Sequence, residues 1–527
     1  MRADYAHCNW QALFTGLERS GVGLKAQIRQ MLVQAIERRV LLPGARLPSG
    51  RHLASMLSVA RITVTEVYQD LEGAGYLIAR ERSGIFVAPP DQAYTTPTAK
   101  IPSIATENWQ SRFAIDVRQA TSLHKPQDWR RYRYPFLLSK LDPRLLPVAE
   151  WRKAIQEASS GRAIQEWSAD VINGDDPALI EQLCLQVLPR RSIWAAPEEV
   201  MITLGTQHAL YLITKLFLKA GSVVGLEDPG YEDLRRIATL ASARIMPVRI
   251  NEWCTQNNQR LPECDMMLLT PGHESASSVP VELAHRQALI EAARKAGTIL
   301  VENDCDSDLF AEGAKAPPLR ACDSERNVIY VGSFSKIISP GLRLGFVVAP
   351  PPVIEGLRAL RRLITRHPPT NNQRAMACFI AQGHYRGHLR RLDAALTTRA
   401  QRMDALLPDL FPDCSWQRGQ GSASVWMRGP EGLDATRLAV MARERGVLLE
   451  PGAMFFNQPS HGARYFRLGF AAIPTDRIEA GLEAVRATLD EYRGLPTGRR
   501  VKTDLALFSI ARNSLPARSF LTAKEPA

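Results

Sequence analysis

The sequence predicts an α/β protein in which a small helical domain precedes a large domain that ends in a smaller α+β part. Three observations predict this arrangement. The chain has 527 residues, which is more than one domain usually contains. Apolar residues in its first part recur mainly at helical spacing. After Trp151, helical stretches alternate with short apolar runs, which is typical of a mostly parallel sheet with helices on both faces.

The composition is that of a globular protein with a full core, because 45% of the residues are hydrophobic and 23% are charged. No apolar run is long enough to span a membrane, and the N-terminus lacks the apolar core of a secretory signal. We therefore expect a cytoplasmic protein without a membrane partner. The eight cysteines form no CxxC pair, which argues against a disulfide framework or a zinc knuckle.

The net charge of +12 and the pI of about 9.4 permit nucleic acid as a partner but do not prove it. Residues 21–90 hold nine Lys and Arg against five Asp and Glu, so the excess is spread along the chain. The tail, residues 493–527, has seven basic and two acidic residues. We expect this tail to be a solvated, poorly ordered extension.

The first domain, residues 21–89, is predicted to contain three helices and a β-hairpin. Apolar residues recur at helical spacing over 24–40, 50–57 and 62–72. Pro43 and Gly44 break the pattern after the first stretch, and Gly73 and Gly75 end the last one. Two β-prone runs, Tyr76–Ala79 and Ile85–Val87, then flank a short turn. This order of elements is that of a three-helix unit with a hairpin wing.

Residues 90–127 are rich in proline, threonine, serine and glutamine, which indicates an interdomain linker. The segment that follows, 128–134, is dense in arginine and aromatic residues. It could contact DNA phosphates, or it could be an edge docked on the large domain, and the sequence does not choose between the two.

The large domain, residues 128–492, is predicted to contain a mostly parallel sheet. Its candidate strands are Val200–Thr203, Val223–Leu226, Met266–Leu269, Ile299–Val301, Val328–Val331 and Gly345–Val348. From about residue 385, helices mix with strands at Ala423–Met427 and Tyr465–Leu468, which predicts the smaller α+β subdomain.

The stretch 47–87 carries a DNA-binding pattern, because a recognition helix needs polar and basic residues at its N-terminal end. Small residues at a wing tip would let the main chain approach phosphate. The candidate DNA-binding residues are Arg51, Arg61, Thr63, Thr65, Ser83 and Gly84. A helical interaction module with ordinary surface arginines would also fit three helices. The whole string, with its P-G-x-x-L-P-S, R-x-T-V-x-x-V-Y-x-x-L and G-Y-L segments, resembles the GntR-type winged helix-turn-helix, which implies a double-stranded DNA operator as partner.

A second constellation indicates a cofactor. Ser333-Phe334-Ser335-Lys336 follows a strand, where a lysine can form a Schiff base with an aldehyde. A serine three residues before this lysine and Arg343 seven residues after it can bind a phosphate dianion. Gly205-Thr206-Gln207 joins a strand to a helix, where backbone N–H groups attract an anion. Tyr231 offers a ring for stacking. Each piece is weak when taken alone.

Together and in this order, these motifs resemble the fold type I aminotransferases, and with the winged helix in front they resemble the MocR subfamily of GntR regulators. The resemblance implies a homodimer that binds pyridoxal 5'-phosphate and an effector such as an amino acid or an amine. It implies that Lys336 bonds the cofactor and Tyr231 stacks on it. It places the phosphate near Gly205, Thr206, Gln207, Ser333, Ser335 and Arg343. Arg467 matches the arginine that binds a substrate carboxylate.

The chain departs from the family pattern inside the implied pocket. The motif E-D-D-Y is here Glu302-Asn303-Asp304-Cys305. Asn303 replaces the aspartate that pairs with the protonated ring nitrogen, so the ring becomes a poorer electron sink. Cys305 replaces the tyrosine that hydrogen-bonds the cofactor's phenolic oxygen, and a thiol is a weak donor. The segment 272–277 has lost the proline and threonine of S-H-x-x-P-T. The sequence therefore predicts weakened cofactor binding and negligible transaminase turnover.

Cys305 and the pair His384 and His388 could belong to functional sites, but we assign none to them. Cys305 could be a redox sensor, but a buried unreactive thiol is the preferred interpretation. His384 and His388 stand four residues apart, as zinc ligands can, yet no third ligand is evident, so we expect no metal and a helix-surface position for both. Two alternatives to a cofactor-dependent regulator remain: an aminotransferase with a DNA-binding appendage, and a regulator that has lost the cofactor.

Overall fold

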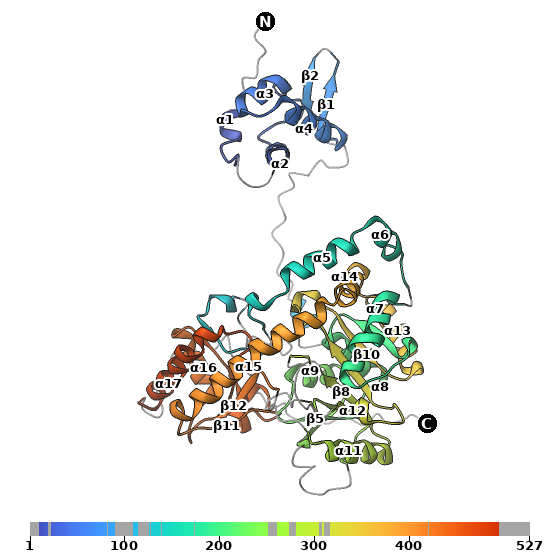
Figure 1. The fold of residues 1–527 in the computed structure, drawn as a ribbon, viewed down its shortest axis with the longest axis vertical. Helices are drawn as coiled ribbons and strands as arrows, with labels where there is room; N and C mark the ends of the chain where they lie inside the picture. Colours follow the sequence, from blue (N-terminus) through green and yellow to red (C-terminus); the bar gives the residue numbers. More distant parts are fainter. Residues whose placement is uncertain are drawn as a thin grey trace, which may run out of the picture. The chain divides into compact units, whose positions relative to one another are not determined.

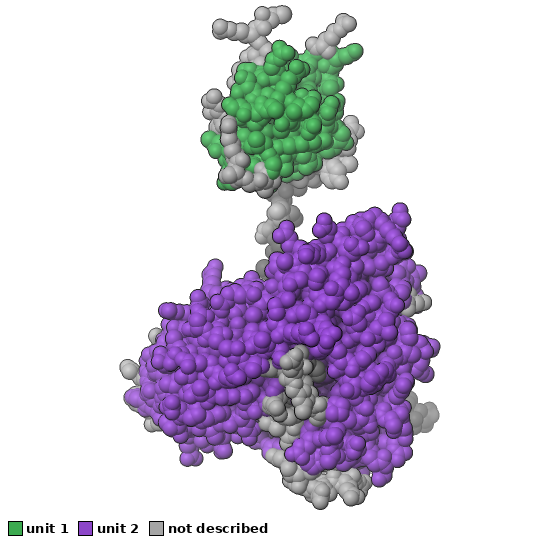
Figure 2. Space-filling model, in the orientation of Figure 1, with its two compact units in different colours: residues 1–112 green, residues 113–527 purple. Residues whose placement is uncertain are grey.

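A computed structural model gives the arrangement of the chain, which forms two compact units, residues 1–112 and 113–527 (Figure 2). The structure describes residues 10–18, 23–81, 83–89, 109–113, 126, 128–138, 140–172, 174–250, 261–272, 281–304, 308–309, 317–419 and 421–494. Within these ranges, none of the helices combines the length and the apolar character that crossing a membrane requires.

The first unit contains the predicted three helices and hairpin (Figure 1). The helices are α2 (Leu24–Glu37), α3 (Gly50–Leu57) and α4 (Arg61–Gly73), and the hairpin strands are β1 (Leu77–Arg80) and β2 (Gly84–Val87). A short helix, α1 (Trp10–Leu13), was not predicted. It lies where Trp10 and Phe14 join the buried core of this unit, and four residues are too few to show a helical period.

The turn between α3 and α4 fixes the angle of the two helices. The Ser49 side chain caps α3 by accepting from the backbone N–H of His52 at 3.3 Å. Ser58 ends α3 in the left-handed region with a φ of 52°. The hydroxyl of the buried Tyr68 donates to the carbonyl of Pro48 at 3.0 Å, which ties α4 to the segment before α3.

The second unit is built on a seven-stranded sheet with the order β4-β10-β9-β8-β7-β5-β6, in which only β10 runs antiparallel to its neighbours. The strands are β4 (Val200–Thr203), β5 (Val223–Glu227), β6 (Arg244–Val248), β7 (Met266–Leu269), β8 (Ile299–Asp304), β9 (Ile329–Ser333) and β10 (Gly345–Val348). All six predicted strands are confirmed. The edge strand β6 was missed, because its exposed residues and Pro247 hide the apolar pattern.

Alternate residues of this sheet pack against different helices, so both faces are covered as predicted. One face carries α8 (Thr206–Phe217), α9 (Glu232–Leu240) and α13 (Pro351–Ile364). The opposite face carries α11 (Leu283–Ala296), α12 (Leu319–Cys322), α7 (Pro177–Gln182), α14 (Thr370–Ala381) and the long α15 (His384–Leu410).

The smaller subdomain is an antiparallel sheet with the order β11-β12-β15-β14, covered by helices. Its strands are β11 (Ser415–Gln417), β12 (Ser424–Arg428), β14 (Glu450–Pro451) and β15 (Tyr465–Gly469), and its helices are α16 (Ala435–Glu444) and α17 (Ile478–Gly494). The two predicted strands of this part are confirmed. Of the predicted tail, only Arg493 and Gly494 lie in the described residues, at the end of α17.

The arginine-rich segment 128–134 is docked on the large domain, which was one of the two alternatives for it. β3 (Tyr134–Pro135) pairs in parallel with β13 (Val447–Leu448), and Trp129 and Tyr132 pack beside Leu137. The neighbouring arginines remain exposed on the surface.

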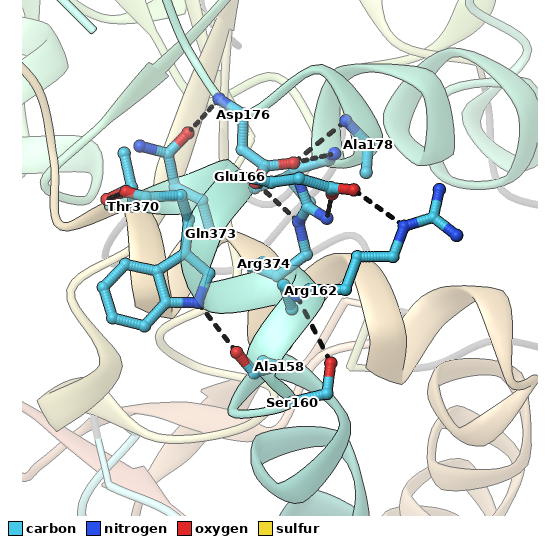
Figure 3. A network of polar contacts seen from close by, with 12 residues as sticks. Ala158, Ser160, Arg162, Glu166, Asp176, Ala178, Thr370, Gln373 and Arg374 are labelled. Atoms are coloured by element: carbon cyan, nitrogen blue, oxygen red, sulfur yellow. Dashed lines mark hydrogen bonds and ion pairs between the residues drawn. The ribbon is translucent and has the colours of Figure 1, made fainter. Parts of the chain in front are cut away.

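A polar network joins α7 and α14 to two further helices, α5 (Val148–Ala158) and α6 (Gly161–Trp167) (Figure 3). Asp176 caps α7 and accepts from Arg374 Nε at 2.8 Å, and the same guanidinium pairs with Glu166 on α6. The hydroxyl of Thr370 donates to the carbonyl of Trp167 at 2.7 Å. Trp167 Nε1 at the end of α6 also donates to the carbonyl of Ala158 on α5 at 2.7 Å, so polar contacts link all four helices.

Candidate DNA-binding surface and cofactor site

The N-terminal end of α4 presents the predicted recognition residues. Arg61 is the first residue of the helix and is exposed, Thr63 is half-buried, and the neighbouring Ile62 is 64% exposed. The hydroxyl of Thr65 donates to the carbonyl of Arg61 at 3.0 Å, so this threonine braces the first turn of α4. Arg51 is exposed near the start of α3.

Two of the three acidic residues of α4 face α2, whereas Glu72 accepts from the N–H of Ala79 on β1. Lys25 on α2 pairs with Glu66 at 3.0 Å and with Asp70 at 3.1 Å. Lys25 thus neutralises two carboxylates that would otherwise repel phosphate. The positive charge of Arg61 then stands at the N-terminal end of α4.

The wing carries two arginines that the sequence reasoning missed. Ser83 and Gly84 are exposed at the turn as predicted, and Gly84 has a φ of 112°, which a residue with a side chain rarely adopts. The side chain of Arg46 lies beside Gly84, and Arg80 stacks over the ring of Phe86 at 4.8 Å. An isolated β-bridge between Arg46 and Phe86 places this arginine at the wing. The two residues are far apart in the sequence, so no local motif predicts this contact.

The predicted cofactor residues come from successive strands and meet at one edge of the large sheet. Gly205 follows β4, Lys336 follows β9, Asn303 is the second-last residue of β8 and Tyr231 follows β5. Arg343 precedes β10, and because β10 is antiparallel its start lies at the same edge. The carboxyl ends of parallel strands are the usual place for a ligand site in such a sheet.

Gly205, Ser335 and Arg343 lie close together in a group that we call the anion cup, after the phosphate that the resemblance implies there. A Cβ on Gly205 would lie 3.3 Å from Arg343 Nη2 and 3.6 Å from Ser335 Oγ, so the glycine, with its φ of 82°, keeps the cup open. Gly205 also precedes the 12-residue helix α8, whose first N–H groups attract an anion. The Oγ of Ser335 is buried and meets no hydrogen-bond partner among the described residues. A phosphate would provide that partner.

Leu204 lies beside the cup, and hydrogen bonds fix both its carbonyl and its N–H. Arg343 Nη2 donates to the Leu204 carbonyl at 2.8 Å, and the Leu204 N–H donates to Nδ1 of His208 at 3.1 Å. Burial, and then the nearby guanidinium groups of Arg361 and Arg343, lower the pKa of His208 from 6.5 to about 4. His208 is therefore neutral at pH 7, with an acceptor at Nδ1. Sequence reasoning missed this residue, although it stands directly after Gly205-Thr206-Gln207.

The other predicted members of the cup are arranged around it. Ser333 is buried at the end of β9, and its Oγ accepts from the N–H of Ser335 at 3.1 Å. Thr206 is half-buried and Gln207 is exposed, both in the first turn of α8. Close approach of β4 and β10 requires Gly345, because a Cβ there would lie 2.9 Å from the Cα of Gly205.

Asn303 is buried, and its Oδ1 has no hydrogen-bond partner in the described parts of the chain. Its neighbours in β8 are acids that point to the opposite face. Glu302 accepts from the N–H groups of Leu319 and Arg320, and burial raises the pKa of Glu302 to about 8. Asp304 accepts from the hydroxyl of Tyr330 at 2.6 Å. Neither acid can replace the missing carboxylate on the side of Asn303.

Lys336 is half-buried in a turn that a buried histidine supports. Nε2 of His388 on α15 bonds the carbonyl of Ile337 at 2.7 Å, and burial lowers the pKa of His388. The expected helix-surface position of His388 is therefore wrong, because the side chain is only 1% exposed. Its apolar neighbours on α15 bury this face of the helix. In the described ranges, no three His, Cys, Asp or Glu side chains are grouped as metal ligands.

A loop of the smaller subdomain holds the segment that carries the stacking residue. The N–H of Gly230 donates to the Phe455 carbonyl at 2.8 Å, and Arg235 Nη1 donates to the same carbonyl at 2.9 Å. The N–H of Asn457 donates to Asp228 Oδ1 at 2.7 Å. Tyr231 is half-buried at the start of α9, and its hydroxyl donates to Asp233 at 2.8 Å. The two sheets therefore approach each other at this segment.

Arg467 lies on β15 with its guanidinium already engaged. Its Nε donates to Oε2 of Glu450 at 2.9 Å, and the guanidinium stacks over the Phe455 ring at 4.4 Å. Cys305 and residues 273–277 of the altered pocket wall lie outside the described residues. Pro271 precedes that wall, and its carbonyl accepts from the buried Arg286 at 2.8 Å.

Two family models match the chain, one for each unit. The model for bacterial regulatory proteins of the gntR family matches residues 24–87, and the model for aminotransferases of class I and II matches residues 136–485. The regulator TauR of Rhodobacter capsulatus is 35% identical over 88% of this chain and 96% of its own length. The chain belongs to the MocR subfamily of GntR regulators.

Other relatives agree with this assignment. The probable rhizopine catabolism regulatory protein MocR of Rhizobium meliloti is 26% identical over 91% of this regulator and 97% of its own length. Among solved structures, the α-aminoadipate aminotransferase LysN of Thermus thermophilus matches with a TM-score of 0.64 and 26% identity, covering 73% of this regulator and 99% of LysN. The protein is a DNA-binding transcriptional regulator with a fold type I aminotransferase domain, a family fold that implies pyridoxal phosphate binding.

Proposed function

We propose that this regulator holds pyridoxal 5'-phosphate at the carboxyl edge of the large sheet and uses it to sense an amine or an amino acid, without transaminase turnover. The anion cup is the observation that carries the proposal. Its Gly205 keeps space open, its Ser335 Oγ is buried and has no hydrogen-bond partner among the residues that the structure describes, and its Arg343 supplies positive charge. These features suit a phosphate dianion.

The residues fit the parts of the cofactor unequally. Gly205, Ser335 and Arg343 would hold its phosphate, Lys336 would bond its aldehyde carbon, and Tyr231 would cover its ring. When bound, the cofactor supplies an aldehyde that captures amines and a pyridine ring that withdraws electrons. Asn303 would donate to an unprotonated ring nitrogen but would not hold a proton there by charge, so the ring would withdraw electrons less strongly.

The regulator acts in the cytoplasm as a homodimer that brings two winged helices to two half-sites of an operator. Exposed apolar side chains on α5 and α6, at Val148, Ile155 and Ile164, offer surface for self-association. A ligand at the cofactor site would change the operator affinity only if it binds the dimer arrangement that fits DNA with a different affinity from the arrangement that does not.

The test measures the affinity of the purified full-length chain for DNA from upstream of its own gene. Titrations are run without cofactor, with pyridoxal phosphate, and with pyridoxal phosphate plus a panel of amines and amino acids. We expect at least one ligand to change the affinity of the wild type by about 5-fold or more, and the Lys336→Ala variant to lose this response while it still binds DNA. An affinity that no combination changes would contradict the sensing function.

A further inference from the structure

Arg467 and Glu450 form a buried ion pair across two neighbouring strands. They are direct partners in the register of β14 and β15, and their exposed fractions are 6% and 2%. The bond from Arg467 Nε to Glu450 Oε2 is 2.9 Å long. The arginine that would receive a carboxylate in this fold is therefore already neutralised by a carboxylate of the chain itself.

The pair lies beside the segment that carries Tyr231, the predicted stacking residue. Phe455 covers the guanidinium of Arg467 with its ring, and its backbone carbonyl accepts from Gly230 and Arg235 in the segment that carries Tyr231. Trp426, which pairs with Arg467 on the other side of β15, packs edge-on against Phe455 with ring centroids 5.5 Å apart. Phe455 and Trp426 thus pack beside the guanidinium of this buried pair, and screening by water is weak there.

The two charges of such a pair determine which charged end group of a ligand binds favourably beside it. A lone carboxylate beside Arg467 also faces the carboxylate of Glu450, and a lone ammonium beside Glu450 also faces the guanidinium of Arg467. A group that carries an ammonium next to a carboxylate meets both charges with complementary ones.

We propose that the Arg467–Glu450 pair is a zwitterion-binding subsite, which selects an effector whose end is an α-amino acid head group over one that ends in a lone carboxylate or a lone ammonium. The inference rests on the proposed function, because a second amine of the same effector must bond the cofactor's aldehyde carbon in place of Lys336. Diamino acids are the class of compound that carries both groups. Glu450 is then the specificity-determining residue, since it cancels the general preference of Arg467 for anions.

The test uses reduced phosphopyridoxyl conjugates, which are anchored by their phosphate and need no chemistry to bind. Four kinds of end group are compared in several chain lengths: an α-amino acid head, a lone carboxylate, a lone ammonium, and a plain methyl. Dissociation constants are measured by isothermal titration calorimetry with the full chain as wild type, Glu450→Gln and Arg467→Gln.

In the wild type we expect the zwitterionic end to bind more than about tenfold tighter than the lone carboxylate at the best chain length. In Glu450→Gln the lone carboxylate should become the preferred end, and in Arg467→Gln the lone ammonium should. The methyl conjugate should bind all three proteins equally, which shows that the anion cup is intact.

A wild type that prefers the lone carboxylate, with the same ranking in Glu450→Gln, would overturn the inference and leave the proposed function standing. If no conjugate bound, the methyl one included, the proposed function would fail and the inference with it.

Discussion

Replacing His208 by glutamine should make the aminotransferase-like domain more resistant to acid. The imidazole is partly buried beside the anion cup, and its Nδ1 accepts from the N–H of Leu204 at 3.1 Å. Burial, with smaller contributions from Arg361 and Arg343, lowers its pKa from 6.5 to about 4 in the folded protein. A glutamine has a carbonyl oxygen that can accept the same hydrogen bond and that does not titrate.

The sign follows from the two pKa values. Above pH 6.5 the ring is neutral in the folded and the unfolded chain, and its titration has no effect on stability. Between pH 6.5 and about 4 the unfolded chain takes up a proton that the folded chain refuses, so the free energy of unfolding falls with pH. The full difference is worth ~3 kcal/mol, and we expect about 2 kcal/mol because the ring is partly exposed to water.

The assay is guanidinium denaturation of the full chain, followed by tryptophan fluorescence, at pH values of about 7 and about 4.5. Between these two pH values His208→Gln should lose about 2 kcal/mol less stability than the wild type. His461→Gln, which alters an exposed imidazole, serves as the matched control and should behave like the wild type. An equal loss in wild type and His208→Gln would refute the assignment of a buried neutral histidine at the cup.

Three further predictions concern the cofactor ring, the operator and the assembly. Asn303→Asp places a carboxylate in a buried position, so the cofactor-free domain should lose about 3 kcal/mol of stability. The affinity of this variant for pyridoxal phosphate should rise about tenfold, because a carboxylate can pair with the protonated ring nitrogen. Thermal unfolding with and without cofactor measures both quantities, and a weaker affinity would contradict this role of Asn303. Arg61→Ala should weaken operator binding by about 1–3 kcal/mol at matched salt, whereas Arg29→Ala, an exposed arginine on α2, should bind as the wild type does in fluorescence anisotropy. Sedimentation of the wild type at micromolar concentration should show a dimer, and a monomer with unchanged operator affinity would rule out the two-headed arrangement.

Much of the fold follows from local patterns in the sequence. The strands β4, β7 and β10 are short, wholly buried apolar runs, and such runs are visible without a structure. The recognition helix α4 buries Val64, Val67 and Leu71 at helical spacing, so its extent was predicted to within a residue at each end. The edge strand β6 and the short α1 lack such a period, and both were missed.

The site was predictable where a motif carries it and unpredictable where distant segments meet. Gly205, Ser335 and Arg343 belong to motifs, and the structure places them around one cup. The ion pair of Arg467 with Glu450 depends on the register of β14 and β15, which no local pattern encodes. His388 was misplaced because it was judged as a possible metal ligand, although the buried Tyr385, Leu389 and Leu392 share its face of α15, which packs against the turn of Lys336.

The central claim is that the chain binds pyridoxal phosphate through Lys336 and does little chemistry with it. An absorption titration of the purified protein with pyridoxal phosphate, followed by borohydride reduction and mass measurement, tests this claim directly. The account predicts a spectral change and a stable covalent adduct in the wild type, and neither in Lys336→Ala, together with negligible turnover of common amino acids. A wild type without a lysine-dependent spectral change would show that the domain works without the cofactor, and turnover at ordinary enzyme rates of about 1–1000 per second would show that it is an enzyme.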